Sequence, residues 1–411
     1  MWTTRKELET ALAQAGLGEW SPRLAAAARH AIILEPGPVE EGADAPIGAS
    51  RLGGQPDLPP DVDWPIRSPL NPEFIAAEYA APGLPDRILF GRLHWLYRLF
   101  RTQNWRRVHE RIQTSRESLR QVRSRAWPLS FVAQIDFAEI HLVHALDSFP
   151  TAGRLSLFCD PYDWPWGHTR EDQARARVIF TEAPAERLQR RRFPQEFDEP
   201  VARAVKPVFR QRRLTPKLLL LPPPFCSREL LALDGVPPPV DWTGIYPKCW
   251  KQQGEQVFEA YNQFWEDLAA EHPNAFGPHF PSTGGVIHQL GGIAFSWQDP
   301  VEADCVKFGD DDYSNHPPEM ERASRGRRRK DGTPIDWPDY EEWSRAYDAF
   351  RARERAMYRE RADSWQLVLQ IDSDYESGMA WGSDGRIYVC IRKGDLAESR
   401  FDRCWTLLQC T

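Results

Sequence analysis

The sequence lacks the short motifs that mark the commonest metal, phosphate and hydrolase sites. It contains no C-x-x-C pair, no H-E-x-x-H, no G-x-S-x-G, and neither glycine-rich phosphate motif, G-x-x-x-x-G-K-[ST] or G-x-G-x-x-G. These absences exclude the standard versions of those sites. We therefore predict no cofactor and no metal ion, and the sequence leaves open whether the protein is an enzyme.

Long apolar runs are also missing. The longest, Leu218–Leu221, stops at three consecutive prolines, far short of the roughly 18 residues that a membrane-spanning helix needs. The first residues, Met1–Leu8, are too charged for the apolar core of a signal peptide. The seven cysteines are an odd number and suggest no disulfide framework. We predict a cytoplasmic protein without membrane contact.

Positive charge is not in excess, because the formal net charge is −7. Arginines nevertheless gather at 87–125, which has helical spacing of its apolar residues, and at 186–213. A solvated or internally paired arginine surface explains these blocks better than nucleic acid does, given the acidic balance of the whole chain. The sequence therefore argues against nucleic-acid binding.

Proline and tryptophan are abundant instead, with 36 and 17 copies. Proline fixes turns and extended segments, which argues against a purely helical bundle. The length of 411 residues exceeds that of one usual core and predicts two domains or two fused halves. Helical patterns over 3–16 and 22–30 precede a predicted strand at Ala31–Leu34.

The most informative stretch is Trp365–Asp374, which alternates as a half-buried strand does. Leu367, Leu369 and Ile371 are expected on one face, and Gln370 and Asp372 on the other. The same Q-I-D phrase occurs earlier in Phe131–Asp136. Each copy is followed by a second predicted strand that begins with Gly-Arg.

A third motif, Leu-Gly-Gly, precedes each Q-I-D strand at a similar distance. Leu52 lies 82 positions before Gln134, and Leu290 lies 80 positions before Gln370. Three motifs in the same order indicate an internal duplication rather than a repeat solenoid. Each glycine pair is expected to form a tight turn with positive φ rather than a phosphate site.

These patterns predict an α+β fold of two similar halves, with mainly antiparallel sheets and peripheral helices. The first half covers 1–240, with an Arg-rich helical insert at about 87–125 and a Pro/Arg-rich linker at about 182–240. The second half covers 241–411. A duplicated chain can be its own pseudo-dimer, so we expect a monomer.

The motifs also resemble those of the YwqG-like family, a bacterial domain of unknown function. The similar phrases are R-L-G-G-Q-P-D-L-P from Arg51, F-V-A-Q-I-D from Phe131, G-R-L-S-L-F from Gly153, L-V-L-Q-I-D-S-D ending at Asp374, and W-G-S-D-G-R-I-Y from Trp381. The resemblance implies a mixed α+β, internally similar protein. It implies no reaction and supplies no catalytic residues.

Eight residues in and beside the paired motifs are candidates for a ligand site at the junction of the halves. They are Gln134, Asp136, Arg154, Gln370, Asp372, Asp374, Trp381 and Arg386. The competing interpretation is structural: each aspartate caps the following turn or pairs with the arginine of the next strand. The D-x-D-x-E run from Asp372 is no calcium loop of the standard kind, because Gly378 is seventh and Ser383 twelfth.

Two functions remain open. The first is a non-catalytic binding protein that engages a protein partner or a small ligand in a groove between the halves. The alternative is a metal-assisted hydrolase using Asp372, Asp374 and Asp136, which would require these carboxylates to converge around an open metal position.

Overall fold

The computed structural model describes residues 2, 4–40, 46–70, 72, 75, 117–197, 207–233, 255–276, 287–310, 361–382 and 384–410. Most of the predicted helical insert at 87–125 therefore lies outside the described residues. Its last part, 117–123, is helical.

A single ten-stranded sheet dominates the fold, in the order β14-β13-β12-β11-β1-β10-β2-β6-β7-β8. Its strands are β1 (Arg29–Val39), β2 (Arg51–Leu52), β6 (Ser130–Asp136), β7 (Arg154–Cys159), β8 (Ala176–Thr181), β10 (Arg212–Leu221), β11 (Gln289–Leu290), β12 (Trp365–Asp372), β13 (Arg386–Arg392) and β14 (Trp405–Gln409). All neighbouring strands in it pair antiparallel. The predicted α+β class with mainly antiparallel pairing is confirmed.

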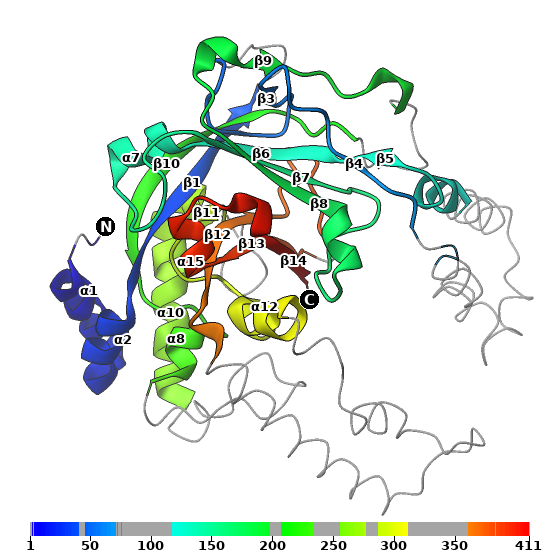
Figure 1. Ribbon diagram of the computed structural model, residues 1–411. Coiled ribbons are helices and arrows are strands. Elements are labelled where there is room, and N and C mark those ends of the chain that lie inside the picture. The colour runs from blue at the N-terminus through cyan, green and yellow to red at the C-terminus, as the bar shows by residue number, and fades with distance from the viewer. Residues whose placement is uncertain are drawn as a thin grey trace, which may run out of the picture.

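Two short pairs flank the large sheet: β3 (Asp57–Leu58) with β9 (Gln189–Arg190), and β4 (Ile66–Arg67) with β5 (Trp127–Pro128). Besides 117–123, the described α-helices include α1 (Arg5–Leu12), α2 (Ser21–Ala27), α7 (Phe137–Val143), α8 (Arg228–Leu231), α10 (Glu255–Glu271), α11 (Pro273–Phe276), α12 (Val301–Gly309) and α15 (Lys393–Ala397). They lie around the sheet (Figure 1). The predicted peripheral helices are thus present.

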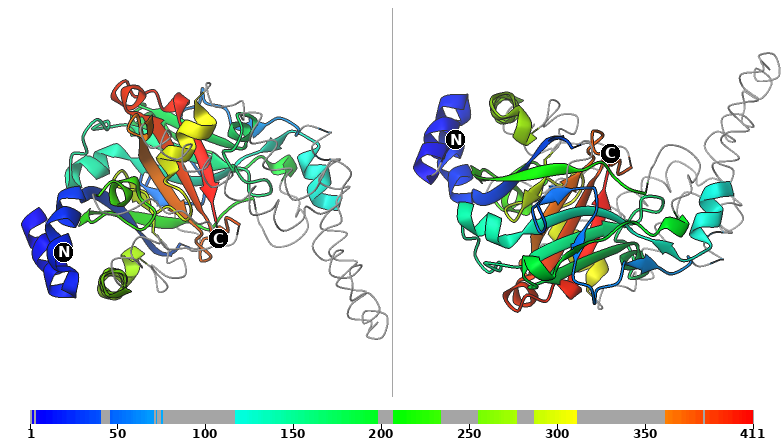
Figure 2. Two further views of the ribbon diagram at one scale, coloured as in Figure 1. Left: turned by 90° about the horizontal axis from the view of Figure 1, so that it is seen from below. Right: turned by 90° about the horizontal axis from the view of Figure 1, so that it is seen from above.

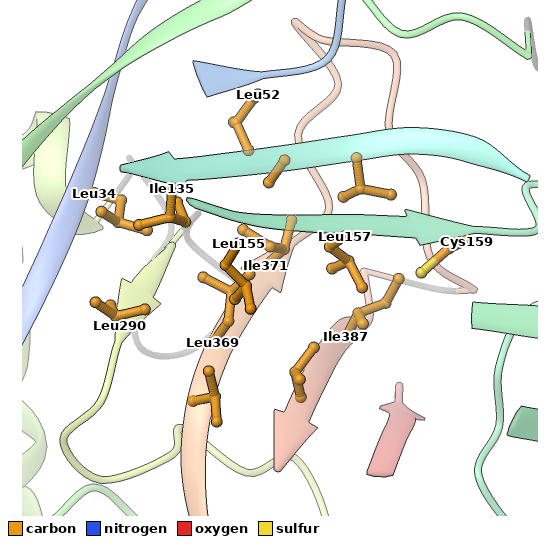
Figure 3. Packing of buried hydrophobic residues seen from close by; sticks show 14 of the residues in the cluster. Leu34, Leu52, Ile135, Leu155, Leu157, Cys159, Leu290, Leu369, Ile371 and Ile387 are labelled. Atoms are coloured by element: carbon orange, nitrogen blue, oxygen red, sulfur yellow. The ribbon is translucent and has the colours of Figure 1, made fainter. Parts of the chain in front are cut away.

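The sheet folds back on itself, so that β6 and β7 face β12 and β13 (Figures 1 and 2). Leu155 and Leu157 of β7 point toward Leu369, Ile371 and Ile387 across the interior (Figure 3). These five side chains are at most 1% exposed and belong to one apolar cluster. Their burial removes apolar surface from water and holds the two layers together.

The two ends of the strand order approach each other through the connection between β7 and β8. Gln173 in this connection donates to the Thr406 carbonyl at 2.9 Å and accepts from the Thr406 amide at 2.8 Å. The Trp405 indole donates to the Gly167 carbonyl at 3.1 Å. The edge of β14 is therefore covered, and the sheet is nearly closed.

Two further cores lie on the outer faces of the sheet. Helices α1, α2 and α10 cover β1 and β10, with Trp265 and Tyr261 of α10 fully buried. Helix α12 covers β12, β13 and β14 (Figure 2). Its Cys305 packs near Cys390. Strand β12 is consequently covered on both faces and not half-buried as predicted.

The face alternation predicted for β12 is interrupted. The pairing of β12 with β13 shifts register between Leu367 and Leu369. Leu367 therefore packs under α12, whereas Leu369 and Ile371 face the interior. One extra residue in a strand reverses the faces that follow, which period-two reasoning does not anticipate. An equivalent shift occurs in β6, between Phe131 and Ala133.

The centre of the sheet is the long pair formed by β1 and β10. Strand β11 adjoins β1, and β2 adjoins β10. Residues 212–221, which fall within the segment predicted as a linker, therefore supply a central strand. The glycine pairs after β2 and β11 have positive φ, as predicted for tight turns: 55° and 74° at Gly53 and Gly54, 63° and 73° at Gly291 and Gly292.

Candidate functional site

Gln134 of β6 holds the chain segment around β2 in place. Its side-chain oxygen accepts from the Asp57 amide at 3.0 Å, and its amide group donates to the Ala49 carbonyl at 3.0 Å. The side chain is fully buried. A buried amide must find such partners, because an unpaired polar group in the interior costs free energy.

Gln370 of β12 does the same around β11. Its side-chain oxygen accepts from the Phe295 amide at 3.0 Å, and its amide group donates to the Ile287 carbonyl at 3.0 Å. In both copies the two partners lie three residues before and five residues after the leucine of the Leu-Gly-Gly motif. The two glutamines therefore have one structural task.

The aspartates of the two motifs pair with the arginines of the next strand. Asp136 and Arg154 lie 3.3 Å apart and are partly exposed, whereas Asp372 and Arg386 lie 2.5 Å apart and are buried. Each pair sits directly across neighbouring strands. The interpretation of Arg154 and Arg386 as charge partners is thus supported by geometry.

Burial changes how these two carboxyl groups titrate. It raises the pKa of Asp372 to about 6, against the opposing charge of Arg386. Burial also raises the pKa of Asp136, with smaller opposing contributions from the Ala138 amide and Arg154. The Ala138 amide donates a hydrogen bond of 3.0 Å to the Asp136 carboxylate. Asp136 is therefore the N-terminal cap of α7, as the structural interpretation predicted.

His288, just before β11, lies between the two aspartates of the second motif. Its Nδ1 accepts from the Asp372 amide at 3.2 Å, and its Nε2 lies 3.8 Å from the Asp374 carboxylate. Beside Asp136 the corresponding contact is made by Ser50, whose hydroxyl group accepts from the Asp136 amide at 2.9 Å. His288 was not predicted, because nothing near it in sequence points to Asp372.

Asp374 anchors the loop between β12 and β13. The guanidinium of Arg212 on β10 donates to both of its carboxylate oxygens, at 2.9 and 2.8 Å, and Ser377 donates from its amide and its hydroxyl group. Burial raises the pKa of Asp374, but the approach of His288 and the charge of Arg212 outweigh it and hold that pKa below its usual range. The contact between His288 and Asp374 is long at 3.8 Å, so Arg212 contributes more than His288 to lowering the pKa of Asp374.

Trp381 closes the base of the same loop and is only 1% exposed. Its indole group donates to the Asp372 carbonyl at 3.2 Å, and its ring packs edge-on against Phe209 at 5.7 Å between centroids. Trp381 therefore positions the loop from inside.

The eight predicted residues thus fall into two groups on opposite sides of the sheet centre. Six are nearly inaccessible, and the polar side chains among the eight contact protein atoms. The three carboxylates pair with three different arginines. Among the described residues no group of three or more His, Cys, Asp or Glu side chains could hold a metal ion. The layers between the groups are filled by apolar side chains (Figure 3).

A buried charge cluster that was not predicted lies beside Gln134. Arg51 and Asp57 approach to 2.8 Å with fully buried side chains, and Arg190 on β9 lies 2.9 Å from the same carboxylate. Burial opposes ionisation of both Arg51 and Asp57, but the hydrogen bond from Arg190 and the charge of Arg51 outweigh it and hold the pKa of Asp57 below its usual range. The sequence signal was the R-L-G-G-Q-P-D phrase itself, whose arginine and aspartate frame the glycine turn.

Around Asp374 and Trp381, the exposed part of the protein is the tip of the β12–β13 loop. Tyr375 is 61% exposed, and its hydroxyl group hydrogen-bonds Asp384. Arg210 donates to the Tyr375 carbonyl at 2.9 Å, and its own amide donates to the Ser377 carbonyl at 2.8 Å. Asp384 has a φ of 53°, a left-handed conformation that is uncommon outside glycine. The loop is therefore exposed at its tip and firmly held at its base.

These features define an α+β protein built on one nearly closed antiparallel sheet, with buried Gln–Asp–Arg networks on both sides of its centre. The model of the family described as domain of unknown function (DUF1963) matches residues 50–410, and the chain belongs to this family. The similarity to YwqG-like proteins is consistent with it. No curated protein matches the chain. None of the helices in the described part is long and apolar enough to cross a membrane.

Proposed function

We propose that this protein is a non-catalytic binding protein, and that it engages a protein partner or a small ligand through the β12–β13 loop, beside the central strand β10. The observation that carries this proposal is the exposed Tyr375 on a loop that buried charges hold in place. Aromatic side chains on fixed loops contribute much of the free energy of binding at interfaces, because little conformational entropy is lost.

The loop has the construction expected of a recognition element. Asp374 and Trp381 secure its two ends from inside the protein, and Arg210 secures its middle. The left-handed backbone at Asp384 is uncommon outside glycine, and such conformations are enriched at functional positions. Five of the residues predicted as a ligand site, Gln370, Asp372, Asp374, Trp381 and Arg386, would then act mainly as the support of the binding surface.

The alternative, a metal-assisted hydrolase using Asp136, Asp372 and Asp374, would require these carboxylates to leave their arginines and share an ion. That is costly, because Arg154, Arg212 and Arg386 would each lose a buried or partly buried carboxylate partner. A divalent-ion titration tests it: a rise in melting temperature that Asp372→Asn abolishes would favour the hydrolase over the binding protein.

Site-specific crosslinking tests the binding proposal directly. A photoreactive amino acid replaces Tyr375 in one variant and Leu142 in another, since Leu142 is 86% exposed and belongs to α7 rather than to the loop. In living cells we expect a defined adduct from position 375 and none from 142.

For a small ligand, the test is a panel of metabolites. Any metabolite that shifts the melting temperature of the parent protein should give no shift in Tyr375→Ala. Equal crosslinking at both positions, together with no thermal shift, would contradict the proposal.

We also infer that the two halves have a common origin. The support is the repeated arrangement of Leu-Gly-Gly turn, Q-I-D strand and Gly-Arg strand, with matching contacts of Gln134 and Gln370. This origin places the boundary between the halves before β10 rather than near residue 240. We also propose, as the sequence predicted, that the protein is bacterial and cytoplasmic and that it is a monomer.

A further inference from the structure

The two central strands do not pair with their nearest sequence neighbours. Strand β1 precedes β2 in the chain, yet it pairs with β10 and β11. Strand β10 precedes β11, yet it pairs with β1 and β2. Each of these strands therefore completes the part of the sheet that the other half of the chain builds (Figure 1).

We call the pairing of β1 with β11, and that of β10 with β2, the two crossings. They are built alike. The Leu34 amide of β1 donates to the His288 carbonyl at 2.8 Å, and the Leu214 amide of β10 donates to the Ser50 carbonyl at 3.1 Å. His288 and Ser50 both lie two residues before the leucine of a Leu-Gly-Gly turn. The crossings are therefore two versions of one contact.

The glycine turns fit against the crossing strands with no room to spare. A Cβ atom on Gly292 would lie 2.5 Å from the Cβ of Ala31 on β1. A Cβ atom on Gly53 would lie 2.4 Å from the backbone carbonyl oxygen of Arg210, two residues before β10. These distances are shorter than any real contact between carbon atoms or between carbon and oxygen, so close packing at each crossing depends on glycine.

The N-terminal segment also belongs to the core of the second half. Ile32 and Ile33 of β1 are fully buried, and Leu8 and Leu12 of α1 pack in one cluster with Trp265 of α10. The family model begins at residue 50 and so leaves this segment out. In this chain, the segment that precedes the family model thus supplies a central strand of the sheet that residues 50–410 otherwise form.

We propose that residues 1–40 are an obligatory strand donor to the second half, and that β10 is the corresponding donor to the first half. The surface that receives β1 is formed by the edges of β10 and β11, and it fits an extended apolar strand of this chain. The two halves are interlocked partners and unfold together. This inference is independent of the proposed binding function.

Cleavage of the full chain tests this proposal. A specific protease site is inserted within 41–45, and the folded protein is cut there. We expect the 1–40 fragment to coelute with 46–411 in gel filtration, to separate only in denaturant, and to unfold with it in one transition. The proposal fails if the fragment leaves under native conditions while the remainder keeps its circular dichroism spectrum and melting temperature.

A matched pair of glycine variants then separates the crossing from general destabilisation. Gly292→Ala and Gly378→Ala both introduce a side chain at positive φ, 73° and 83°, but only the first meets β1, since nothing lies within 4 Å of the second. In the cut protein we expect Gly292→Ala to raise the dissociation constant of the 1–40 fragment by about tenfold or more over Gly378→Ala. Equal dissociation constants would overturn the proposal.

A milder pair serves if Gly292→Ala does not fold. Ile33→Val and Ile391→Val each remove one methylene group from a fully buried isoleucine, on β1 and β13 respectively. Only Ile33→Val should weaken retention of the fragment, whereas both variants should lower the melting temperature of the uncut chain. The same weakening by both variants would show that β1 is not a distinct donor.

A second cut tests the reciprocal donation by β10. With a protease site within 198–206, the fragments 1–197 and 207–411 should remain together after cleavage, because β1 and β10 each pair across the cut. Separation into two fragments that both retain cooperative unfolding would show that the halves are independent domains and would refute the exchange.

Discussion

Arg212 donates to both carboxylate oxygens of Asp374, although the two residues are 162 positions apart in the chain. Arg212 is the first residue of the central strand β10, and Asp374 begins the loop that exposes Tyr375. The pair is nearly inaccessible, with side-chain exposures of 11% and 2%. It therefore connects the middle of the sheet to the proposed binding loop through one charge-assisted contact.

Asp374→Asn should destabilise the protein strongly. The amide keeps the shape of the side chain but leaves the Arg212 charge with only the exposed carboxylate of Glu376, 3.2 Å away, as a counterion. Removal of one partner from a buried pair costs up to about 3 kcal/mol. Urea unfolding followed by circular dichroism measures the change in free energy of unfolding. Ligand binding at Tyr375 should weaken as well, because the loop loses its anchor.

The exposed pair of Arg400 and Asp402 provides the matched control, since its side chains are 42% and 62% exposed. Water and salt screen such a pair, so Asp402→Asn should leave the free energy of unfolding unchanged within error. A similar loss in both variants would mean that burial does not decide the contribution of these ion pairs.

The contributions of Asp372 and Asp374 to the free energy of unfolding should change with pH in opposite directions. The folded-state pKa of Asp372 is raised to about 6, so between about pH 4 and 6 the folded protein binds a proton there that the unfolded chain does not. Stability from this group therefore increases as the pH falls through 6. The pKa of Asp374 is lowered, so its stabilisation is present above its unfolded pKa and is lost as the pH falls below about 4.

The parent and Asp372→Asn, measured from pH 7.5 to 4.5, test this sign. Relative to the variant, the parent should gain free energy of unfolding as the pH falls, with a slope of at most about 1.4 kcal/mol per pH unit. Asp136→Asn is a useful comparison, because Asp136 is more exposed and its pKa is less shifted. A parent that loses stability against Asp372→Asn over this range would show that Arg386 lowers the pKa of Asp372 more than burial raises it.

Local sequence patterns predicted much of the framework. Gln134–Asp136 and Gln370–Asp372 end strands as expected, and the Gly-Arg segments open the strands beside them. Strand β1 includes the predicted Ala31–Leu34. These elements depend on side-chain alternation and glycine turns, which act over a few residues and are visible in a single sequence.

The missed features depend on contacts between distant residues. Strand β10 was hidden in an Arg- and Pro-rich segment, because its identity as a central strand comes from pairing with β1 and β2. Arg212 counted as one arginine in a charged block, whereas its meaning comes from Asp374. His288 was likewise invisible as a partner of Asp372. Tertiary pairing decides each case, and periodicity carries no information about it.

The buried thiols Cys159 and Cys305 should resist alkylation in the native protein. Both are fully buried, and burial raises the pKa of each thiol well above its ordinary value, so the reactive thiolate is scarce. With iodoacetamide at pH 8, mass spectrometry should find both unmodified until denaturant is added. A cysteine introduced as Leu142→Cys, at an exposed position of α7, should react within the normal time for a free thiol. Rapid native labelling of Cys305 would instead indicate that α12 leaves the sheet frequently.

Gln134 and Gln370 should contribute equally to stability if the two halves share one structural plan. Each holds one amide and one carbonyl group of the chain around a Leu-Gly-Gly turn, and each is fully buried. Replacement by leucine keeps the volume but leaves two backbone groups unpaired, at a cost of about 2–4 kcal/mol in each variant.

The double variant tells whether these two sites act through one cooperative structure. The interior between β6–β7 and β12–β13 is continuous, so loss of either turn should lower the melting temperature of the whole protein in a single transition. If the sites are separate enough not to interact directly, the free energies lost in Gln134→Leu and Gln370→Leu should add in the double variant. Two resolved transitions in either single variant would contradict the interlocked sheet, because each half could then unfold without the other.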